Sequence, residues 1–175
     1  LSDRFATLSN FLNVFKQAAG LGFASLGQTL VILTGGIDLS VGAMISLTSN
    51  LTSGWIDGNP DLVIPVVLGI LALGAAIGSI NGLLSYYLRI HPLIVTLGMA
   101  AVLQGTTLLY SLSPAGSVPV EFEIFAYGDV FGVPIAGLVM LAMFAIVGVF
   151  LNRTRTGTAI YAVGGDPRAA HLRAA

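Results

Sequence analysis

The sequence predicts an all-α protein, a polytopic bundle of membrane-crossing helices in which one helix is interrupted near Gly35–Gly42. Three observations predict this fold class. Of the 175 residues, 55% are hydrophobic and only 9% are charged, whereas about a quarter of the residues in a soluble domain are charged. Long apolar segments recur along the chain, and about 20 apolar residues are enough to cross a bilayer. The 22 glycines suit helices that pack closely inside a membrane.

Five apolar segments are expected to form these helices. They run over residues 17–33, 41–55, 62–88, 93–112 and 130–151. Ser9 or Asn10 is expected to cap the first helix, because their side-chain oxygens accept backbone N–H groups at a helix start. The second segment carries Ser, Thr and Asn side chains between residues 46 and 53. That composition is too polar for a lipid-facing helix, so this segment is expected to lie inside the bundle or to line a path.

The positions of arginine predict the orientation of the segments. Short loops on the cytoplasmic side of a membrane collect Lys and Arg. Arginine occurs in the break at 89–92 and after residue 152, whereas 57–61 and 113–129 contain acidic residues and neither Lys nor Arg. We therefore expect 89–92 and 152–175 to be cytoplasmic, and 57–61 and 113–129 to be external loops. This orientation places Asp38 toward the cytoplasmic half.

The first notable motif is Gly35-Gly36-Ile37-Asp38-Leu39-Ser40-Val41-Gly42, whose Asp38 is the only charged residue between Lys16 and Asp57. An ionisable group at membrane depth is expensive and usually functional. The motif glycines Gly35, Gly36 and Gly42 predict a break in the backbone. Asp38 or Ser40 is then expected to cap the helix that restarts. The residues leave open whether the motif is a joint beside a transport path, a tight cytoplasmic turn, or a direct contact with substrate.

Four polar residues inside apolar segments are candidates for lining a path across the membrane. They are Asn50, Asn81, Thr96 and Gln104. The alternative for each is a hydrogen bond between helices, which contributes about 1 kcal/mol. As a set they predict a bundle with a polar interior.

Several functional classes are excluded by what the 175 residues lack. Lys16 is the only lysine and no phosphate-binding loop is present, so ATP hydrolysis is not expected in this chain. There is no cysteine, and His91 and His171 have no partners at metal-ligand spacing. A net charge of −1 offers no basic surface for nucleic acid. We expect neither an enzyme, a metal site nor a cofactor.

A second notable stretch lies near the end of the chain. After a turn at Gly164-Gly165, Asp166 is expected to be a helix N-cap with Pro167 at the first helical position. A short helix of small residues there suits docking into a groove of another protein. The alternative is an ordinary connector to a further span.

Three motifs occur in a fixed order: Leu33–Gly42, Ile94–Met99, and Thr154–Gly157 leading into Ile160–Asp166 and Ala169-Ala170. Together they resemble the permease subunit of bacterial ABC importers for ribose, xylose and related monosaccharides. The resemblance covers about residues 10–170. It implies a multi-pass protein of the bacterial cytoplasmic (inner) membrane. Members of that family are longer, so residues 1–175 are expected to be one transmembrane permease domain that lacks the first and the C-terminal spans.

The resemblance also implies partners and a mechanism. Import of a ribose- or xylose-like sugar would proceed by alternating access, with a second permease copy, a cytoplasmic ATPase subunit and an extracytoplasmic sugar-binding protein. The loop that contacts the ATPase would consist of Gly164, Gly165, Asp166, Pro167, Arg168, Ala169 and Ala170. The sequence departs from the family at Asp166, where Asn is usual, and in the last five residues.

Other functions stay open at this stage. A permease for branched-chain amino acids or nucleosides shares the broader fold. An ATPase-independent channel or secondary transporter is a different class. A membrane scaffold without transport activity is disfavoured by the polar residues within the spans.

Overall fold

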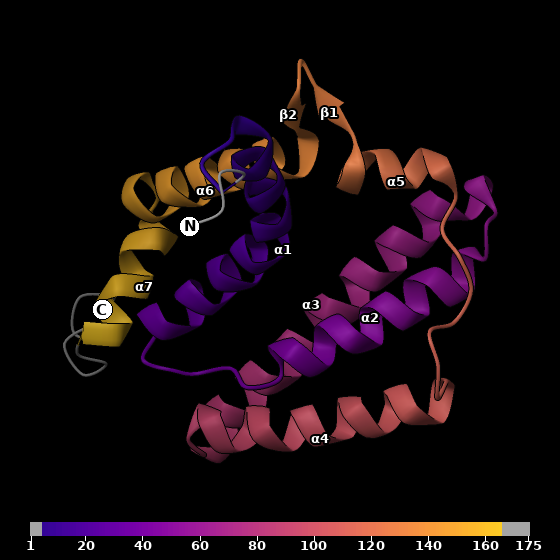
Figure 1. Cartoon of the computed structure of the whole chain (residues 1–175). Coiled ribbons are helices and arrows are strands. Elements are labelled where there is room, and N and C mark those ends of the chain that lie inside the picture. The colour runs from indigo at the N-terminus through magenta and orange to yellow at the C-terminus, as the bar shows by residue number, and fades with distance from the viewer. Residues whose placement is uncertain (1–4, 166–175) are drawn as a thin grey trace. The chain divides into compact units, whose positions relative to one another are not determined.

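The computed structural model, in which residues 5–165 are described, is almost entirely helical within those residues (Figure 1). The helices are α1 (Leu8–Leu33), α2 (Val41–Ile56), α3 (Val63–Leu88), α4 (Pro92–Tyr110), α5 (Val120–Tyr127), α6 (Ile135–Arg153) and α7 (Arg155–Gly165). A 3₁₀ turn, η1 (Pro60–Leu62), precedes α3, and strands β1 (Asp129–Val130) and β2 (Val133–Pro134) form a small antiparallel hairpin. The all-α prediction is confirmed.

The chain divides into two compact units. The first, called the α1/α6 unit, comprises Leu1–Gly35 and Glu123–Ala175. The second, called the α2–α4 unit, comprises Gly36–Phe122. One junction between the units falls between Gly35 and Gly36, inside the motif that the sequence singled out.

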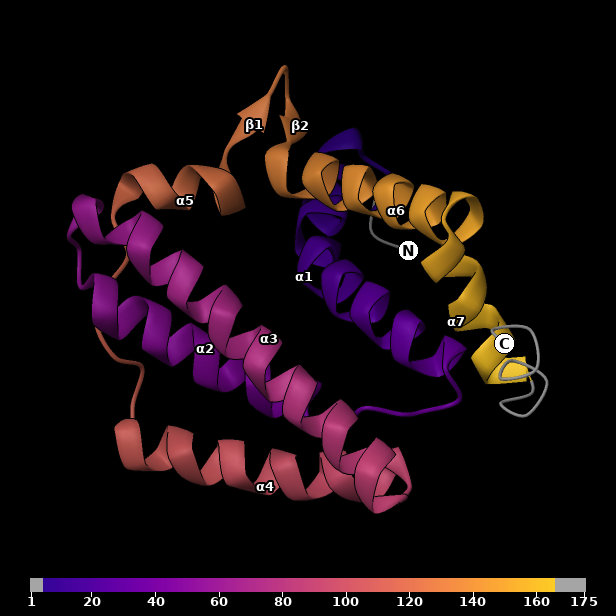
Figure 2. The same cartoon turned by 180° about the vertical axis from the view of Figure 1, so that it is seen from behind.

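The core of the α2–α4 unit forms where α2 packs against both α3 and α4 (Figure 2). Ala43, Leu47 and Leu51 of α2 are buried with Ile77 of α3 and Leu103 of α4. The α2 residues are spaced four apart, which places them on one face of the helix. This face of α2 therefore packs in the core, and the polar residues of α2 lie elsewhere on its surface.

In the α1/α6 unit, α1 packs along α6 and also contacts α7. Glycine permits this approach at two positions. A Cβ at Gly22 would overlap the Met140 side chain, and a Cβ at Gly137 would overlap the Phe15 ring. Small residues at such crossings let membrane helices approach each other closely.

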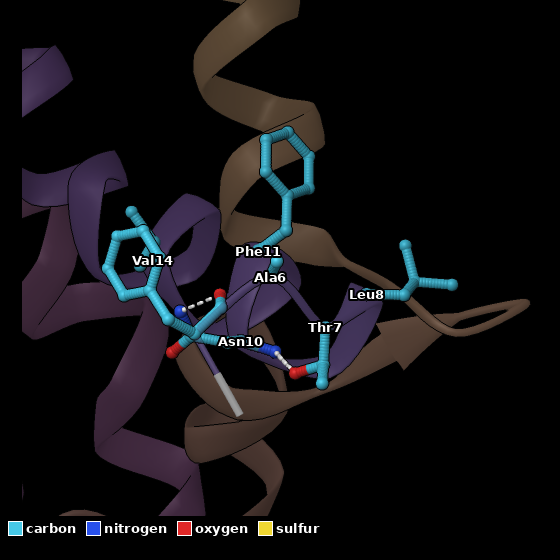
Figure 3. Close-up of a pocket in the computed structure, with 7 residues that line it drawn as sticks. Ala6, Thr7, Leu8, Asn10, Phe11 and Val14 are labelled. Atoms are coloured by element: carbon cyan, nitrogen blue, oxygen red, sulfur yellow. Dashed lines mark hydrogen bonds between the residues drawn. The ribbon is translucent and has the colours of Figure 1, made fainter. Parts of the chain in front are cut away.

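The start of α1 differs from the prediction (Figure 3). The N-cap is Thr7, not Ser9 or Asn10, because Thr7 has an extended backbone and its Oγ1 accepts the Asn10 N–H at 3.3 Å. The Asn10 side chain instead donates to the Phe5 carbonyl at 3.0 Å. A hollow beside these residues is formed by this short stretch alone and is mostly apolar, so it carries no functional assignment.

Three other local predictions are wrong. The external loop predicted at 113–129 contains the helix α5, and the segment predicted from residue 130 becomes helical only at Ile135, because residues 129–134 form the hairpin. The turn predicted at Gly164-Gly165 is the last turn of α7. The Thr154 side chain explains why a new helix follows α6 so closely: its Oγ1 accepts the Gly157 N–H at 3.0 Å and caps α7.

Three helical segments within the described residues are long and apolar enough to cross a membrane: Pro60–Leu88, Pro92–Tyr110 and Ile135–Arg153. Most of their side chains are exposed in the isolated chain, as expected for surfaces that face lipid or other transmembrane helices. Of the other two predicted spans, α2 has only 16 residues. The first lies in α1, which is long enough with 26 residues but is less apolar than the three segments above.

Candidate functional site

The connection between α1 and α2 is the first part of the candidate site. Helix α1 ends at Leu33, and Gly35 follows with φ +83°, a left-handed conformation that side chains other than glycine rarely adopt. Helix α2 starts at Val41. The predicted interruption is therefore present, and it spans the residues between Leu33 and Val41.

Asp38 organises the start of α2. One of its carboxylate oxygens, Oδ1, accepts the Ser40 N–H at 2.7 Å and the Ser40 hydroxyl at 2.6 Å. Ser40 is the N-cap of α2, but its own side chain makes no capping bond. An acidic group at a helix N-terminus is also favoured by the helix dipole. Of the two predicted capping candidates, Asp38 is thus the one whose side chain accepts a backbone N–H at the restart.

Thr96 fastens the same connection to α4. Its Oγ1 accepts the Leu39 N–H at 3.1 Å and lies 3.1 Å from the Ile37 carbonyl oxygen, to which it can donate. Thr96 is only 4% exposed. Two backbone polar groups of the irregular connection are therefore satisfied by one buried hydroxyl, as backbone without helical hydrogen bonds inside a membrane protein requires.

Asn81 of α3 extends this arrangement. Its Nδ2 donates to the Ser40 Oγ at 3.2 Å. Because the Ser40 hydroxyl donates its proton to Asp38, the Ser40 oxygen accepts from Asn81, and a directed chain runs from Asn81 through Ser40 to Asp38. The other amide atom, Asn81 Oδ1, is buried without a hydrogen-bond partner among the described residues.

The structure thus brings together Asp38, Ser40, Asn81 and Thr96, and we call these four residues the motif cluster. The remaining candidates lie apart from it. Asn50 donates to the Ser46 carbonyl within α2 at 3.0 Å, and Gln104 is exposed on α4. Gly42 faces open space, so close packing does not explain the glycine there.

The end of α7 forms a second part of the candidate site. A Cβ on Gly164 would overlap the carbonyl oxygen of Leu33, the last residue of α1, whereas a Cβ on Gly165 would meet nothing. Gly164 therefore allows α7 to abut the end of α1, two residues before Gly35. Residues 166–170, the rest of the predicted ATPase-contacting loop, lie outside the described residues.

Four hydroxyl residues of α2 line one cavity, and the sequence did not predict that they lie together. Thr48, Ser49, Thr52 and Ser53 of α2 lie along a cavity in the α2–α4 unit. The polar character of this helix is already evident in the sequence. Ser46 and Asn50 share the same three- and four-residue spacing, so the spacing alone does not separate them from the four residues that line the cavity.

The chain is all-α with several apolar spans, and one helix is interrupted beside a buried polar cluster. These features define a polytopic membrane protein. Residues 10–174 match the family described as "Branched-chain amino acid transport system / permease component". The chain belongs to this family. With its membrane-spanning helices, this makes it a multi-pass protein of the bacterial cytoplasmic membrane.

Curated relatives match nearly the whole chain. The ribose import permease protein of Bacillus subtilis is 39% identical over 97% of this chain and 53% of its own length. The ribose import permease protein of Escherichia coli is 36% identical over 98% of this chain and 55% of its own length. The D-allose transport system permease protein of Escherichia coli is 34% identical over 96% of this chain and 52% of its own length.

The chain spans about half the length of the curated relatives it matches. No solved structure gives a significant match. The resemblance to the sugar importer permeases is confirmed, and the relatives are transport components, not enzymes.

Proposed function

We propose that this chain belongs to the transmembrane permease of an ATP-driven importer that passes a monosaccharide across the cytoplasmic membrane. The observation that carries the proposal is the 39% and 36% identity to two ribose import permeases over nearly the entire chain. The allose permease among the relatives supports a sugar substrate. The family description names branched-chain amino acids, but these relatives favour a sugar over that alternative.

The proposal includes partner proteins. The 175 residues contain no phosphate-binding loop, so ATP is hydrolysed by a separate cytoplasmic ATPase subunit. An extracytoplasmic sugar-binding protein delivers the substrate, and a second permease copy completes the pathway. Alternating access then opens the pathway first to one side of the membrane and then to the other.

The coupling between ATP and transport runs, in this proposal, through the end of α7. The ATPase contacts the loop of residues 164–170, and Gly164 lies against the carbonyl of Leu33. A displacement of α7 therefore acts on the end of α1. Gly35, with its left-handed backbone, follows directly and serves as the joint that lets the motif cluster respond. Asp38 has a positioning role at this joint and does not contact the sugar.

The transport proposal is tested in membrane vesicles that carry the complete permease with its ATPase and binding protein. We expect ATP-dependent uptake of D-ribose or D-allose and none of L-leucine. Uptake that continues at full rate without ATP would instead identify a channel or secondary transporter. Uptake of leucine alone would identify an amino acid permease.

The coupling proposal has a matched pair of variants. Gly164→Ala should lower the number of sugar molecules imported per ATP hydrolysed by at least several-fold, because the added methyl group meets the Leu33 carbonyl. Gly165→Ala adds the same methyl group in open space and should leave this ratio unchanged. A purely structural defect would reduce the amount of assembled transporter without changing the ratio. Equal ratios in the two variants would refute the coupling role of Gly164.

A further inference from the structure

A cavity of about 450 Å³ lies within the α2–α4 unit, bordered by α2, by Ile70 of α3, and by Val118 and the start of α5. One wall carries the hydroxyl groups of Thr48, Ser49, Thr52 and Ser53, and the other carries Val118 and Phe122. We call this cavity the hydroxyl groove. Its volume falls within the range of small-molecule binding sites, which combine apolar surfaces with a few placed polar groups.

The hydroxyl residues of the groove lie mostly on the side of α2 away from its core residues, although Ile70 of α3, which packs against the core, also lines the groove. The core-forming residues Ala43, Leu47 and Leu51 repeat every four positions. The four hydroxyl residues follow the same helical period but are displaced around the helix to roughly the opposite face. None of the four belongs to the core cluster, so core packing does not account for this run of hydroxyl side chains.

The hydroxyl groups of the groove have spare hydrogen-bonding capacity. Thr48 donates to the Met44 carbonyl at 2.8 Å, Thr52 to the Thr48 carbonyl at 2.6 Å and Ser53 to the Ser49 carbonyl at 2.9 Å. Each of these three oxygens can still accept a hydrogen bond. Ser49 is exposed, and its hydroxyl has no hydrogen bond among the described residues, so it can donate as well as accept. The groove thus offers several acceptors and one donor, without any formal charge.

The apolar wall is held in place by the backbone. Gly58 donates its N–H to the Ser117 carbonyl at 2.9 Å, which fixes the segment before Val118 to the end of α2. Gly116 has φ +63°, and a Cβ there would overlap the Ser53 carbonyl. The position of Val118 and Phe122 beside the hydroxyl groups therefore follows from a close backbone approach that requires glycine.

The chemistry of the two walls selects among ligand classes. A monosaccharide has hydroxyl groups around its rim, which both donate and accept, and less polar C–H surfaces on its faces. A free amino acid carries an ammonium and a carboxylate group, which require charged or strongly polar partners when they leave water. None of the residues that line the groove is charged. The groove therefore fits a neutral polyol and not a zwitterion.

We propose that the hydroxyl groove is a binding site for the transported monosaccharide, with Thr48, Ser49, Thr52 and Ser53 as hydrogen-bonding partners and Phe122 as the apolar surface. This inference rests on the proposed function. It names the part of the permease that contacts the sugar, and it assigns that contact to α2 and not to the motif cluster.

The absence of cysteine from the 175 residues permits a direct test by site-specific labelling. Ser49→Cys is introduced into the complete permease in membranes, with any cysteine elsewhere in that protein replaced by serine. The reaction of the introduced thiol with a water-soluble maleimide is timed with and without D-ribose, D-allose or D-fructose. A sugar present at about ten times its Kd should slow the reaction about tenfold, since only the unoccupied fraction reacts. L-Leucine should not slow it.

Ser46→Cys is the matched control, because Ser46 is an exposed serine of the same helix that does not line the groove. Its labelling should not respond to sugar. The proposal would be overturned if none of the three sugars protected the Ser49→Cys thiol, or if that thiol did not react because protein or lipid covers it. If the same preparation still imports sugar with ATP, the proposed function stands and only the groove assignment fails.

A second variant tests the hydroxyl groups themselves. Thr52→Val, combined with Ser49→Cys, keeps the shape of the side chain and removes one acceptor. The sugar concentration that half-protects the introduced thiol should therefore rise about three- to tenfold. Thr106→Val provides the control, because Thr106 also donates to a carbonyl of its own helix, that of Val102 at 2.9 Å, but lies outside the groove. An equal effect of the two variants would contradict a specific role for Thr52.

Discussion

The two breaks between consecutive helices, α1 to α2 and α6 to α7, are built in different ways. At the first break, Asp38 accepts hydrogen bonds at the start of α2, and side chains from α3 and α4 reach into the connection. At the second, Thr154 accepts from Gly157 and donates to Phe150, both of which are near neighbours in sequence. The first break is fixed by tertiary contacts, whereas the second is fixed locally. A short local motif is thus enough to start a new helix after Thr154, whereas the connection between α1 and α2 is held by residues from other helices.

The largest expected effect comes from Asp38. Replacing it by Ala removes an acceptor of two short hydrogen bonds, and bonds to a charged group contribute about 1.5–3 kcal/mol. Asp38→Asn keeps an acceptor oxygen and should lose less. Thermal unfolding of the complete permease in detergent would measure both variants. Equal stability of Asp38→Ala and the unaltered protein would show that the first break does not depend on this carboxylate.

The second largest effect is expected at Thr96 of α4, which forms hydrogen bonds with the connection between α1 and α2. Thr96→Val leaves the Leu39 N–H and the Ile37 carbonyl without their partner, and a buried unsatisfied group costs about 1–3 kcal/mol. Thr106→Val on the same helix should change stability by less than about 0.5 kcal/mol. The difference between the two variants, measured by the same unfolding assay, isolates the tertiary contact. No difference would mean that the hydrogen bonds from Thr96 do not stabilise the connection between α1 and α2, and that this connection, like the one at Thr154, depends on near neighbours in sequence.

The smallest effect is expected at the second break. Thr154→Val removes the cap of α7, and loss of an N-cap costs about 1 kcal/mol. The loss should be confined to α7 and appear as faster amide hydrogen exchange there, while exchange in α2 stays unchanged. Faster exchange in α2 would indicate that the two breaks are energetically linked.

The sequence predicted those features that local chemistry determines. The glycines at 35 and 36 predicted the first break. Asp38, the only charge in a long apolar stretch, was predicted to cap the helix that follows. The start of α1 was misplaced at Ser9 or Asn10 because both are good caps, and only the backbone conformation distinguishes Thr7. Helix α5 was missed because it lies in a stretch where Ser, Pro and Gly are common.

The composition of the candidate site was only partly predictable. Asn81 and Thr96 were named with Asn50 and Gln104 as polar residues inside apolar segments. Only the first two meet the motif, because the direction in which each residue points depends on how its helix is rotated against its neighbours. The hydroxyl groove required, in addition, knowledge of which face of α2 the core occupies.

The hydrogen bond between Leu39 and Thr96 joins residues 57 positions apart. During synthesis, the Leu39 N–H at the beginning of α2 therefore has no partner until α3 and the first five residues of α4 have left the ribosome. The polar start of α2 would meanwhile lack a partner in an apolar environment, which is unfavourable. This contact consequently makes insertion of α2, α3 and α4 as one group more favourable than insertion of one helix at a time.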